Sequence, residues 1–78
     1  LNALAEPWLG VNVHNHIAEF RKAAGLSQQE LADAINVSRK TISTIETSRF
    51  TPSVIIALKI AQYFNTSVES LFSLDEYD

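Results

Sequence analysis

Residues 26–46, LSQQELADAINVSRKTISTIE, predict two short helices joined by a tight turn. Ser27 is a good N-cap, and Glu30 three residues later completes an S-x-x-E capping box at the start of the first helix. Asn36 ends this helix, because asparagine tolerates the left-handed backbone conformation better than most residues. Ser38 then caps the second helix.

The second helix has one apolar and one polar face. Ile42 and Ile45 point one way, toward a core. At about 100° per residue, the opposite face carries residues at i, i+3, i+4 and i+7, namely Lys40, Ser43, Thr44 and Thr47. One cation and three hydroxyls near a helix N-terminus suit contact with phosphates and base edges. An ordinary solvated face has the same pattern, so the stripe alone leaves both interpretations open.

The wider sequence resembles the lambda-repressor/Cro (Xre-type) helix-turn-helix family from about residue 17 to residue 74. The matching segments are RKAAGLSQQELA at 21–32, VSRKTISTIE at 37–46, PSVIIALKIA at 52–61 and VESLF at 68–72. The resemblance implies an all-α, compact five-helix domain. It also implies a short, single-domain member of the family, in which the DNA-binding domain is nearly the whole protein.

The family resemblance predicts a sequence-specific, double-stranded DNA-binding transcriptional regulator, most simply a repressor. Its recognition helix, at about 38–47, would dock in the major groove. We expect base contacts from the start and outward face of this helix, at Ser38, Arg39, Lys40, Ser43 and Thr44. Backbone phosphate contacts are expected from Gln28, Thr41 and Arg49.

Arg21 lies near the buried stripe of a first helix expected at about 15–24, an unusual place for a charge. The resemblance implies that it pairs with Glu46, at the end of the recognition helix. This would be a structural ion pair between the two helices rather than a DNA contact. Gly25 is expected to end the first helix as a C′ glycine.

Family members commonly bind DNA as homodimers on near-palindromic operators, and the short final helix often supplies the contact between subunits. The resemblance therefore implies a homodimer. The first candidate interface comprises Leu71, Phe72 and Leu74.

The length of 78 residues is enough for one domain with a small core. No cysteine is present, so neither disulfides nor cysteine-ligated metals can reinforce it. Hydrophobic residues make up 46% of the chain, which is typical of globular proteins. No apolar run reaches the roughly 18 residues of a membrane span, and no signal peptide is visible. We expect a cytoplasmic protein without membrane, cofactor or small-molecule ligand.

The net charge of −3 argues against a nucleic-acid partner, but its distribution weakens that objection. All six lysines and arginines lie between residues 21 and 59, together with only three of the nine acids. The flanks hold the other six acids and no cation. This asymmetry predicts a basic face with an acidic periphery, and a modest, salt-sensitive non-specific affinity for DNA.

The two ends fall outside the resemblance. Residues 1–13 are expected to form an extension or tail, residues 14–74 the helix-turn-helix domain, and residues 75–78 an acidic tail. Val11 and Val13 alternate with a polar residue, as Phe72 and Leu74 do near the other end. This alternation predicts a minor two-strand pairing of the ends.

The segment after the recognition helix predicts a loop followed by a helix that Ser53 caps. We expect Phe50 to be buried as a core plug rather than exposed as a stacking platform. The inward side of the helix is predicted to carry Val54, Ala57, Leu58 and Ala61. Its outward side is predicted to carry Ile55, Lys59, Gln62 and Tyr63.

An enzymatic role is not expected, because the chain lacks a cysteine nucleophile, a glycine-rich phosphate loop and a convincing pair of carboxylates. His14 and His16 lie two residues apart, but a metal site would need partners such as Asp75 or Glu76, which nothing in the sequence positions. We therefore expect exposed histidines and no metal.

A protein-interaction or antitoxin-like module with the same fold is the second hypothesis, since fold does not determine function. The acidic total, the unmatched N-terminal segment and the predicted outward pair of Ile55 and Tyr63 favour it. Arg39, Lys40 and Arg49 favour DNA, because a scaffold has no need of cations there.

Overall fold

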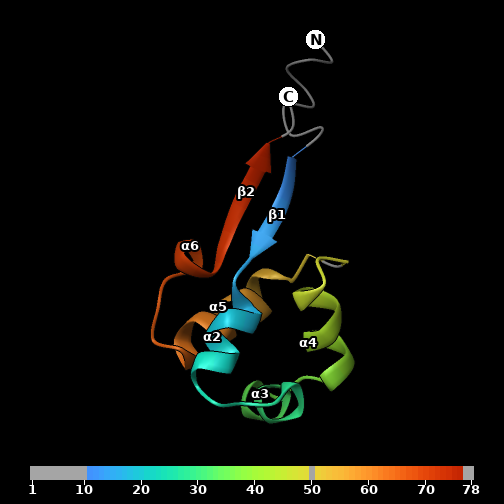
Figure 1. The fold of residues 1–78 in the computed structure, drawn as a ribbon, viewed down its shortest axis with the longest axis vertical. Coiled ribbons are helices and arrows are strands. Elements are labelled where there is room, and N and C mark those ends of the chain that lie inside the picture. Colours follow the sequence, from blue (N-terminus) through green and yellow to red (C-terminus); the bar gives the residue numbers. More distant parts are fainter. Residues whose placement is uncertain (1–10, 50, 77–78) are drawn as a thin grey trace.

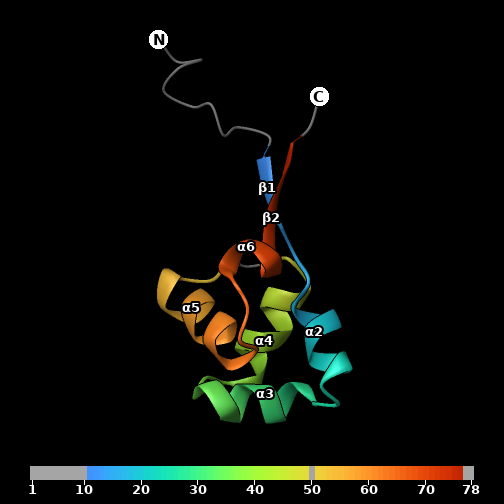
Figure 2. The ribbon, with the colours of Figure 1, turned by 90° about the vertical axis from the view of Figure 1, so that its left-hand side faces the viewer.

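The computed structural model describes residues 11–49 and 51–76. Their elements follow in the order β1 (Val11–Asn15), α2 (Ile17–Ala23), α3 (Gln28–Ile35), α4 (Arg39–Glu46), α5 (Val54–Tyr63), α6 (Val68–Leu71) and β2 (Phe72–Glu76). The helices form a bundle, and the two strands project from it as a ribbon at the end opposite α3 (Figures 1 and 2). The predicted five-helix domain with a minor strand pairing is confirmed.

Serine hydroxyls start four of the five described helices. In each case the side chain accepts a hydrogen bond from the backbone N–H three residues later, which satisfies one of the unpaired donors of the first turn. These N-caps are Ser27, Ser38, Ser53 and Ser67. At Ser27 the reciprocal bond from Glu30 is also present, so the predicted capping box is confirmed.

Left-handed residues end four of these helices: Gly25, Asn36, Ser48 and Asn65 have φ values of 73°, 61°, 61° and 54°. After each of them, the next backbone N–H returns to a carbonyl five residues earlier, as in the Schellman motif. The four bonds are Leu26 to Arg21, Val37 to Ala32, Arg49 to Thr44 and Thr66 to Ala61. In each connection between successive helices, a left-handed residue therefore ends one helix and a serine caps the next.

The hydrophobic core draws one or more side chains from every described helix. Its buried members are Ile17, Leu31, Ala32, Ile35, Ile42, Ile45, Ile60, Ala61 and Leu71. Half-buried side chains such as Phe20 and Phe64 pack around them, with ring centroids 5.7 Å apart. The predicted inward positions of the recognition helix, Ile42 and Ile45, are fully buried.

The two strands pair antiparallel, with Val13 opposite Leu74 and Asn15 opposite Phe72. Asn15 belongs to β1, so the first helix is shorter than the predicted 15–24. The reason is that the Asn15 side chain caps this helix from outside, by accepting from Ile17 N at 3.2 Å. The strands also extend to residues 11 and 76, beyond the expected domain limits of 14 and 74.

The prediction for α5 was wrong at two positions. Val54 and Leu58 were expected inward, but they are 74% and 46% exposed, whereas Ile60 and Ala61 are buried. Seven of its ten residues, VIIALKIAQY, are aliphatic, so the sequence has no clear polar side to set the rotation of the helix. Contact with α3 and α6 sets that rotation instead. Ile55 is 67% exposed and Tyr63 is 45% exposed, as expected.

Two further expectations concern Phe50 and a membrane span. Phe50, predicted to plug the core, lies outside the described residues. Within the part of the chain that the structure describes, no helix is long and apolar enough to span a membrane.

Gly25 provides a test of the left-handed stops. A methyl group added there meets no atom within 4 Å, so only backbone strain opposes it. Gly25→Ala should lower the free energy of unfolding by about 1 kcal/mol. Gly25→Asn should lose clearly less, because asparagine tolerates the conformation. Urea denaturation measures both, and equal losses for the two variants would contradict the role of backbone strain.

Candidate nucleic-acid interface

Helix α4 forms one side of the bundle and buries only its inner face (Figure 1). Its core side chains are Ile42 and Ile45, and α3 packs beside it through Leu31 and Ile35. The remaining side chains of α4 lie toward solvent or at the edge of the core. The outer surface is therefore a single exposed helix face held on a rigid neighbour, the arrangement that a helix needs to enter the major groove.

A shallow hollow of about 310 Å³ lies on this outer surface. It is lined by Ser38, Lys40, Thr41, Thr44 and Arg49. Four of these belong to α4 or its cap, and Arg49 returns to the helix through its backbone N–H, which donates to Thr44 O at 3.0 Å. All five residues that line the hollow are among the predicted DNA contacts.

All three hydroxyls that line the hollow are already hydrogen-bonded within the protein. Ser38 Oγ lies 2.8 Å from Thr41 Oγ1 and also accepts from Thr41 N. Thr44 Oγ1 donates to Lys40 O at 2.9 Å. By contrast, Ser43 Oγ makes no hydrogen bond within the described residues. Of the predicted readers with hydroxyl groups, Ser43 therefore has the freest donor.

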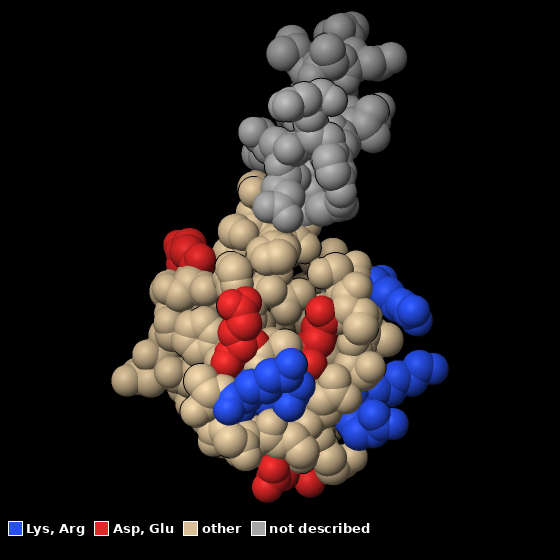
Figure 3. Space-filling view, viewed as in Figure 1, with Lys and Arg blue, Asp and Glu red and all other residues tan. Residues whose placement is uncertain are grey.

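The cations of this surface are exposed. Arg39, Lys40 and Arg49 all have solvent-exposed side chains. Figure 3 shows blue side chains projecting from the edge of the molecule where α4 lies in Figure 1, whereas the red side chains visible on this face lie farther inward, at the bottom and at the opposite edge. A local positive field thus coexists with a net charge of −3.

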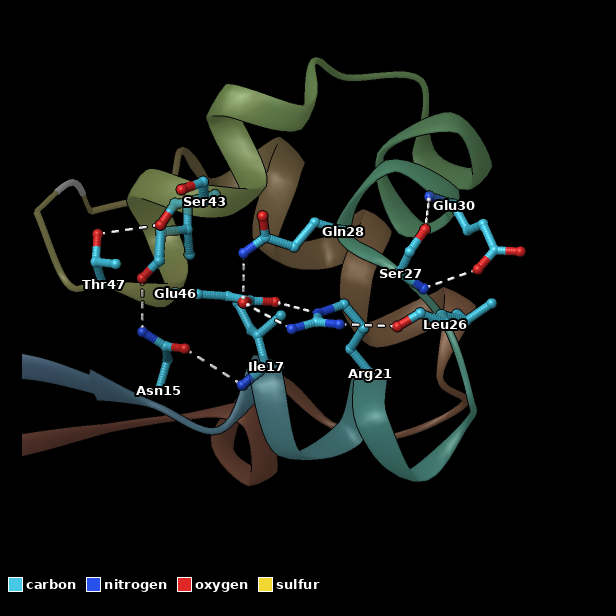
Figure 4. A network of polar contacts seen from close by, with 11 residues as sticks. Asn15, Ile17, Arg21, Leu26, Ser27, Gln28, Glu30, Ser43, Glu46 and Thr47 are labelled. Carbon is cyan, nitrogen blue, oxygen red and sulfur yellow. Dashed lines mark hydrogen bonds and ion pairs between the residues drawn. The ribbon is translucent and has the colours of Figure 1, made fainter.

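Behind the recognition helix, Arg21 and Glu46 form the predicted contact, Nε to Oε2 at 2.7 Å, with side chains only 12% and 7% exposed (Figure 4). Arg21 also donates to Glu46 Oε1 and to the carbonyl of Leu26. Gln28 Nε2 donates to the same Glu46 oxygen at 3.0 Å. The carboxylate therefore joins α2, the start of α3 and the end of α4.

This environment shifts both pKa values. Burial would raise the pKa of Glu46, but hydrogen bonds from Arg21 and Gln28, with the charges of Arg21 and Lys22, outweigh it and lower that pKa. The hydrogen bond to Glu46 raises the pKa of Arg21 against a smaller opposing effect of burial. Both groups are charged at neutral pH, so the pair is ionic.

Two residues make hydrogen bonds that the sequence analysis did not predict. Gln28, expected to contact phosphate, donates its amide N–H to Glu46. Asn15 was not singled out, yet its Nδ2 donates to Ile45 O at 2.8 Å and so satisfies a carbonyl in the last turn of α4 (Figure 4). Its place two residues before a helix was the available signal, since asparagine favours such capping positions.

The predicted dimer residues separate into three environments. Leu71 is fully buried in the core, so its side chain is not available to a second subunit. Phe72 is half-buried against the same core, and Leu74 is 59% exposed. The sequence also predicts that Leu71 is buried in the short last helix, and this is confirmed, whereas full burial is not compatible with a place in a dimer interface.

The histidines before α2 serve local contacts. His14 and His16 stack edge to face with centroids 4.9 Å apart, and His16 Nδ1 lies 2.8 Å from Glu19 Oε1. No group of three or more potential metal ligands occurs among the residues that the structure describes.

Comparison with known proteins agrees with this geometry. A helix-turn-helix family model matches residues 17–71, which covers all five helices. An uncharacterized HTH-type transcriptional regulator from Archaeoglobus fulgidus is 41% identical over 64 residues, covering 82% of this chain and 91% of that protein. The chain therefore belongs to the Xre/Cro-type helix-turn-helix family, whose members are DNA-binding transcriptional regulators rather than enzymes.

Two other relatives show the same extent of similarity. An uncharacterized HTH-type transcriptional regulator from Methanothermobacter thermautotrophicus is 44% identical over 61 residues, covering 77% of this chain and 88% of its own length. The uncharacterized regulator YgzD from Bacillus subtilis is 37% identical over 62 residues, covering 80% and 94% respectively. These similarities extend over nearly the whole of each relative.

The ion pair provides a pH-dependent test. Glu46→Gln should lower the free energy of unfolding by about 2–4 kcal/mol at pH 7, because Arg21 loses its ionic partner in a shielded site. Since folding lowers the pKa of Glu46, its contribution is complete above the unfolded value of about 4.3 and is lost as pH falls through the folded value. The stability difference between the two proteins should therefore begin to narrow below about pH 4.3 and disappear as the pH falls through the lower pKa of folded Glu46.

Urea denaturation at a series of pH values measures this difference. Glu69→Gln, which removes an exposed acid from α6, is the matched control for net charge and should change stability little. A Glu46→Gln variant with unchanged stability at pH 7 would show that the pair contributes nothing.

Proposed function

We propose that this protein is a sequence-specific DNA-binding transcriptional regulator, most simply a repressor, which inserts α4 into the major groove. The hollow that unites Lys40, Thr44 and Arg49 on the outer face of α4 carries this proposal. Family membership supports it independently. Such a regulator would act in the cytoplasm, with the DNA that it controls.

Each residue of the surface has a role that fits its chemistry. Arg39, Lys40 and Ser43 have side-chain donors suited to guanine or other base acceptors. Ser38 and Thr41 lie at the start of α4, where exposed N–H groups and the helix dipole favour a phosphate. Arg49, held beside the helix by its backbone, would neutralise a second phosphate.

Gln28 has an indirect role in this proposal. Its amide N–H is committed to Glu46, but its side chain is only half-buried, at the start of α3. The amide oxygen can therefore still face DNA or water, while the nitrogen orients the carboxylate. Its substitution would affect both the ion pair and the approach of the backbone.

A homodimer is the assembly that we infer. The exposed flank of α5 carries Val54, Ile55 and Leu58, and Leu74 is exposed on β2. Neighbouring exposed apolar side chains on one helix are a common sign of a protein contact. Two subunits with α4 helices about 34 Å apart would read a near-palindromic operator in successive major grooves.

Selection of binding sequences from a random double-stranded DNA pool tests the function. Recovery of an enriched, near-palindromic motif would support the proposal. Recovery of no motif at low salt would instead favour the protein-interaction module, for which the exposed apolar flank of α5 would be the partner surface.

Two substitutions should separate base reading from phosphate contact. On the selected operator, Lys40→Ala should cost about 1–3 kcal/mol and relax the preference at one base position. Arg49→Ala should weaken binding to all sequences alike and reduce the salt slope of log K by about 1. Competition binding at several salt concentrations measures both effects. Identical behaviour of the two variants across sequences would contradict these roles.

The dimer surface has its own test. Leu58→Glu combined with Val54→Glu should convert a dimer to a monomer with little loss of subunit stability, because both side chains are exposed in the subunit. Tyr63→Ser, on another side of α5, is the matched control and should leave the dimer intact. Sedimentation equilibrium distinguishes these outcomes, and a dimer that survives the double substitution would place the interface elsewhere.

A further inference from the structure

We propose that Thr44 selects thymine at one position of the operator through its methyl group, and that its hydroxyl donates no hydrogen bond to a base. The inference rests on the proposed docking of α4 in the major groove, and it names the chemical group that one residue of that helix reads.

The hydroxyl of Thr44 is turned back to its own helix. Thr44 Oγ1 donates to Lys40 O at 2.9 Å and lies 3.1 Å from Thr41 O, so its single proton is shared between two backbone carbonyls. A hydroxyl in this arrangement has no proton for the acceptors that bases present in the major groove, such as guanine O6 or thymine O4. The oxygen keeps only acceptor lone pairs, which suit adenine N6 or cytosine N4 and not thymine O4, so toward thymine the side chain offers its methyl group alone.

The position of this side chain is also determined. The Thr44 carbonyl accepts from Arg49 N at 3.0 Å and from Thr47 Oγ1 at 3.2 Å, which anchors the residue from its C-terminal side. Thr44 is half-buried and lines the same hollow as Lys40 and Arg49. If these two cations contact DNA, a residue that shares their hollow is brought close to the base edges.

Ser43 provides the contrast within the same helix. Its hydroxyl has no hydrogen bond among the described residues, so it keeps a donor for a base or a phosphate. Adjacent residues of α4 therefore differ in kind: Ser43 offers a polar contact and Thr44 offers an apolar one. Of the four standard bases only thymine has a methyl group in the major groove, and threonine methyls contact it well.

Operator DNA in which single thymines are replaced by deoxyuridine isolates the methyl group, because uracil lacks only that group. Loss of one buried methyl contact should weaken wild-type binding about fourfold per half-site, at one thymine position and not at the others. Binding is measured by fluorescence anisotropy at fixed salt on the operator recovered by selection.

Two substitutions of Thr44 separate the effect of its methyl group from that of its hydroxyl. Thr44→Val keeps the methyl and removes the hydroxyl, so the preference for thymine over uracil should persist. Thr44→Ser keeps the hydroxyl and removes the methyl, so binding to the thymine operator should fall about fourfold per half-site and the preference should vanish. Thermal melting of each variant verifies that the domain is folded.

Thr47→Ser is the matched control, since Thr47 Oγ1 also donates to a backbone carbonyl, at Ser43, but the residue does not line the hollow. This variant should keep the wild-type ratio between the two operators. If Thr44→Val loses the thymine preference and Thr44→Ser keeps it, the hydroxyl reads the base and the proposal is overturned.

The proposal also fails if wild-type protein binds every uracil-substituted operator as tightly as the thymine operator, or if both Thr44 variants keep the preference. In either case the operator still binds, so the proposed DNA binding is not contradicted. Failure to enrich any DNA sequence is a different result, because it removes the proposed function itself.

Discussion

The shielded ion pair between Arg21 and Glu46 is the interaction on which the rest of the domain depends. Each charge has several partners: the guanidinium also contacts the Leu26 carbonyl, and the carboxylate also accepts from Gln28. A charge withdrawn from water is tolerated only when such partners are in place. Because these partners come from α2, α3 and the segment between them, the angle of α4 against its neighbours has little freedom.

Polar side chains around α4 are also hydrogen-bonded mostly within the protein. Asn15 satisfies a carbonyl near its C-terminus, Ser38 caps its N-terminus, and the hydroxyl of Thr44 returns to the backbone. These internal bonds hold the helix in place and leave few groups free for a partner. The free donors gather at the exposed cations and Ser43, which explains how a chain with net negative charge can present a basic reading face.

Much of the fold could be predicted from local sequence, because helix limits depend on neighbouring residues. The serine caps, the capping box at Ser27 and the left-handed residues at Gly25 and Asn36 all lie where the sequence places them. The alternation of apolar residues near both ends predicted the strand pairing. The charged pair of Arg21 and Glu46 required the family resemblance, since nothing local joins residues 25 positions apart.

The sequence by itself thus determined the serine-capped starts of four helices, which face of α4 is buried, and the family to which the chain belongs. Only the tertiary structure decided the rotation of α5 and the partners of Gln28, Asn15 and Thr44. The physical reason is the distance along the chain between the residues that interact. Caps and turns are satisfied within a few residues, whereas the phase of an almost wholly apolar helix and the hydrogen bonds of a polar side chain depend on elements distant in the chain.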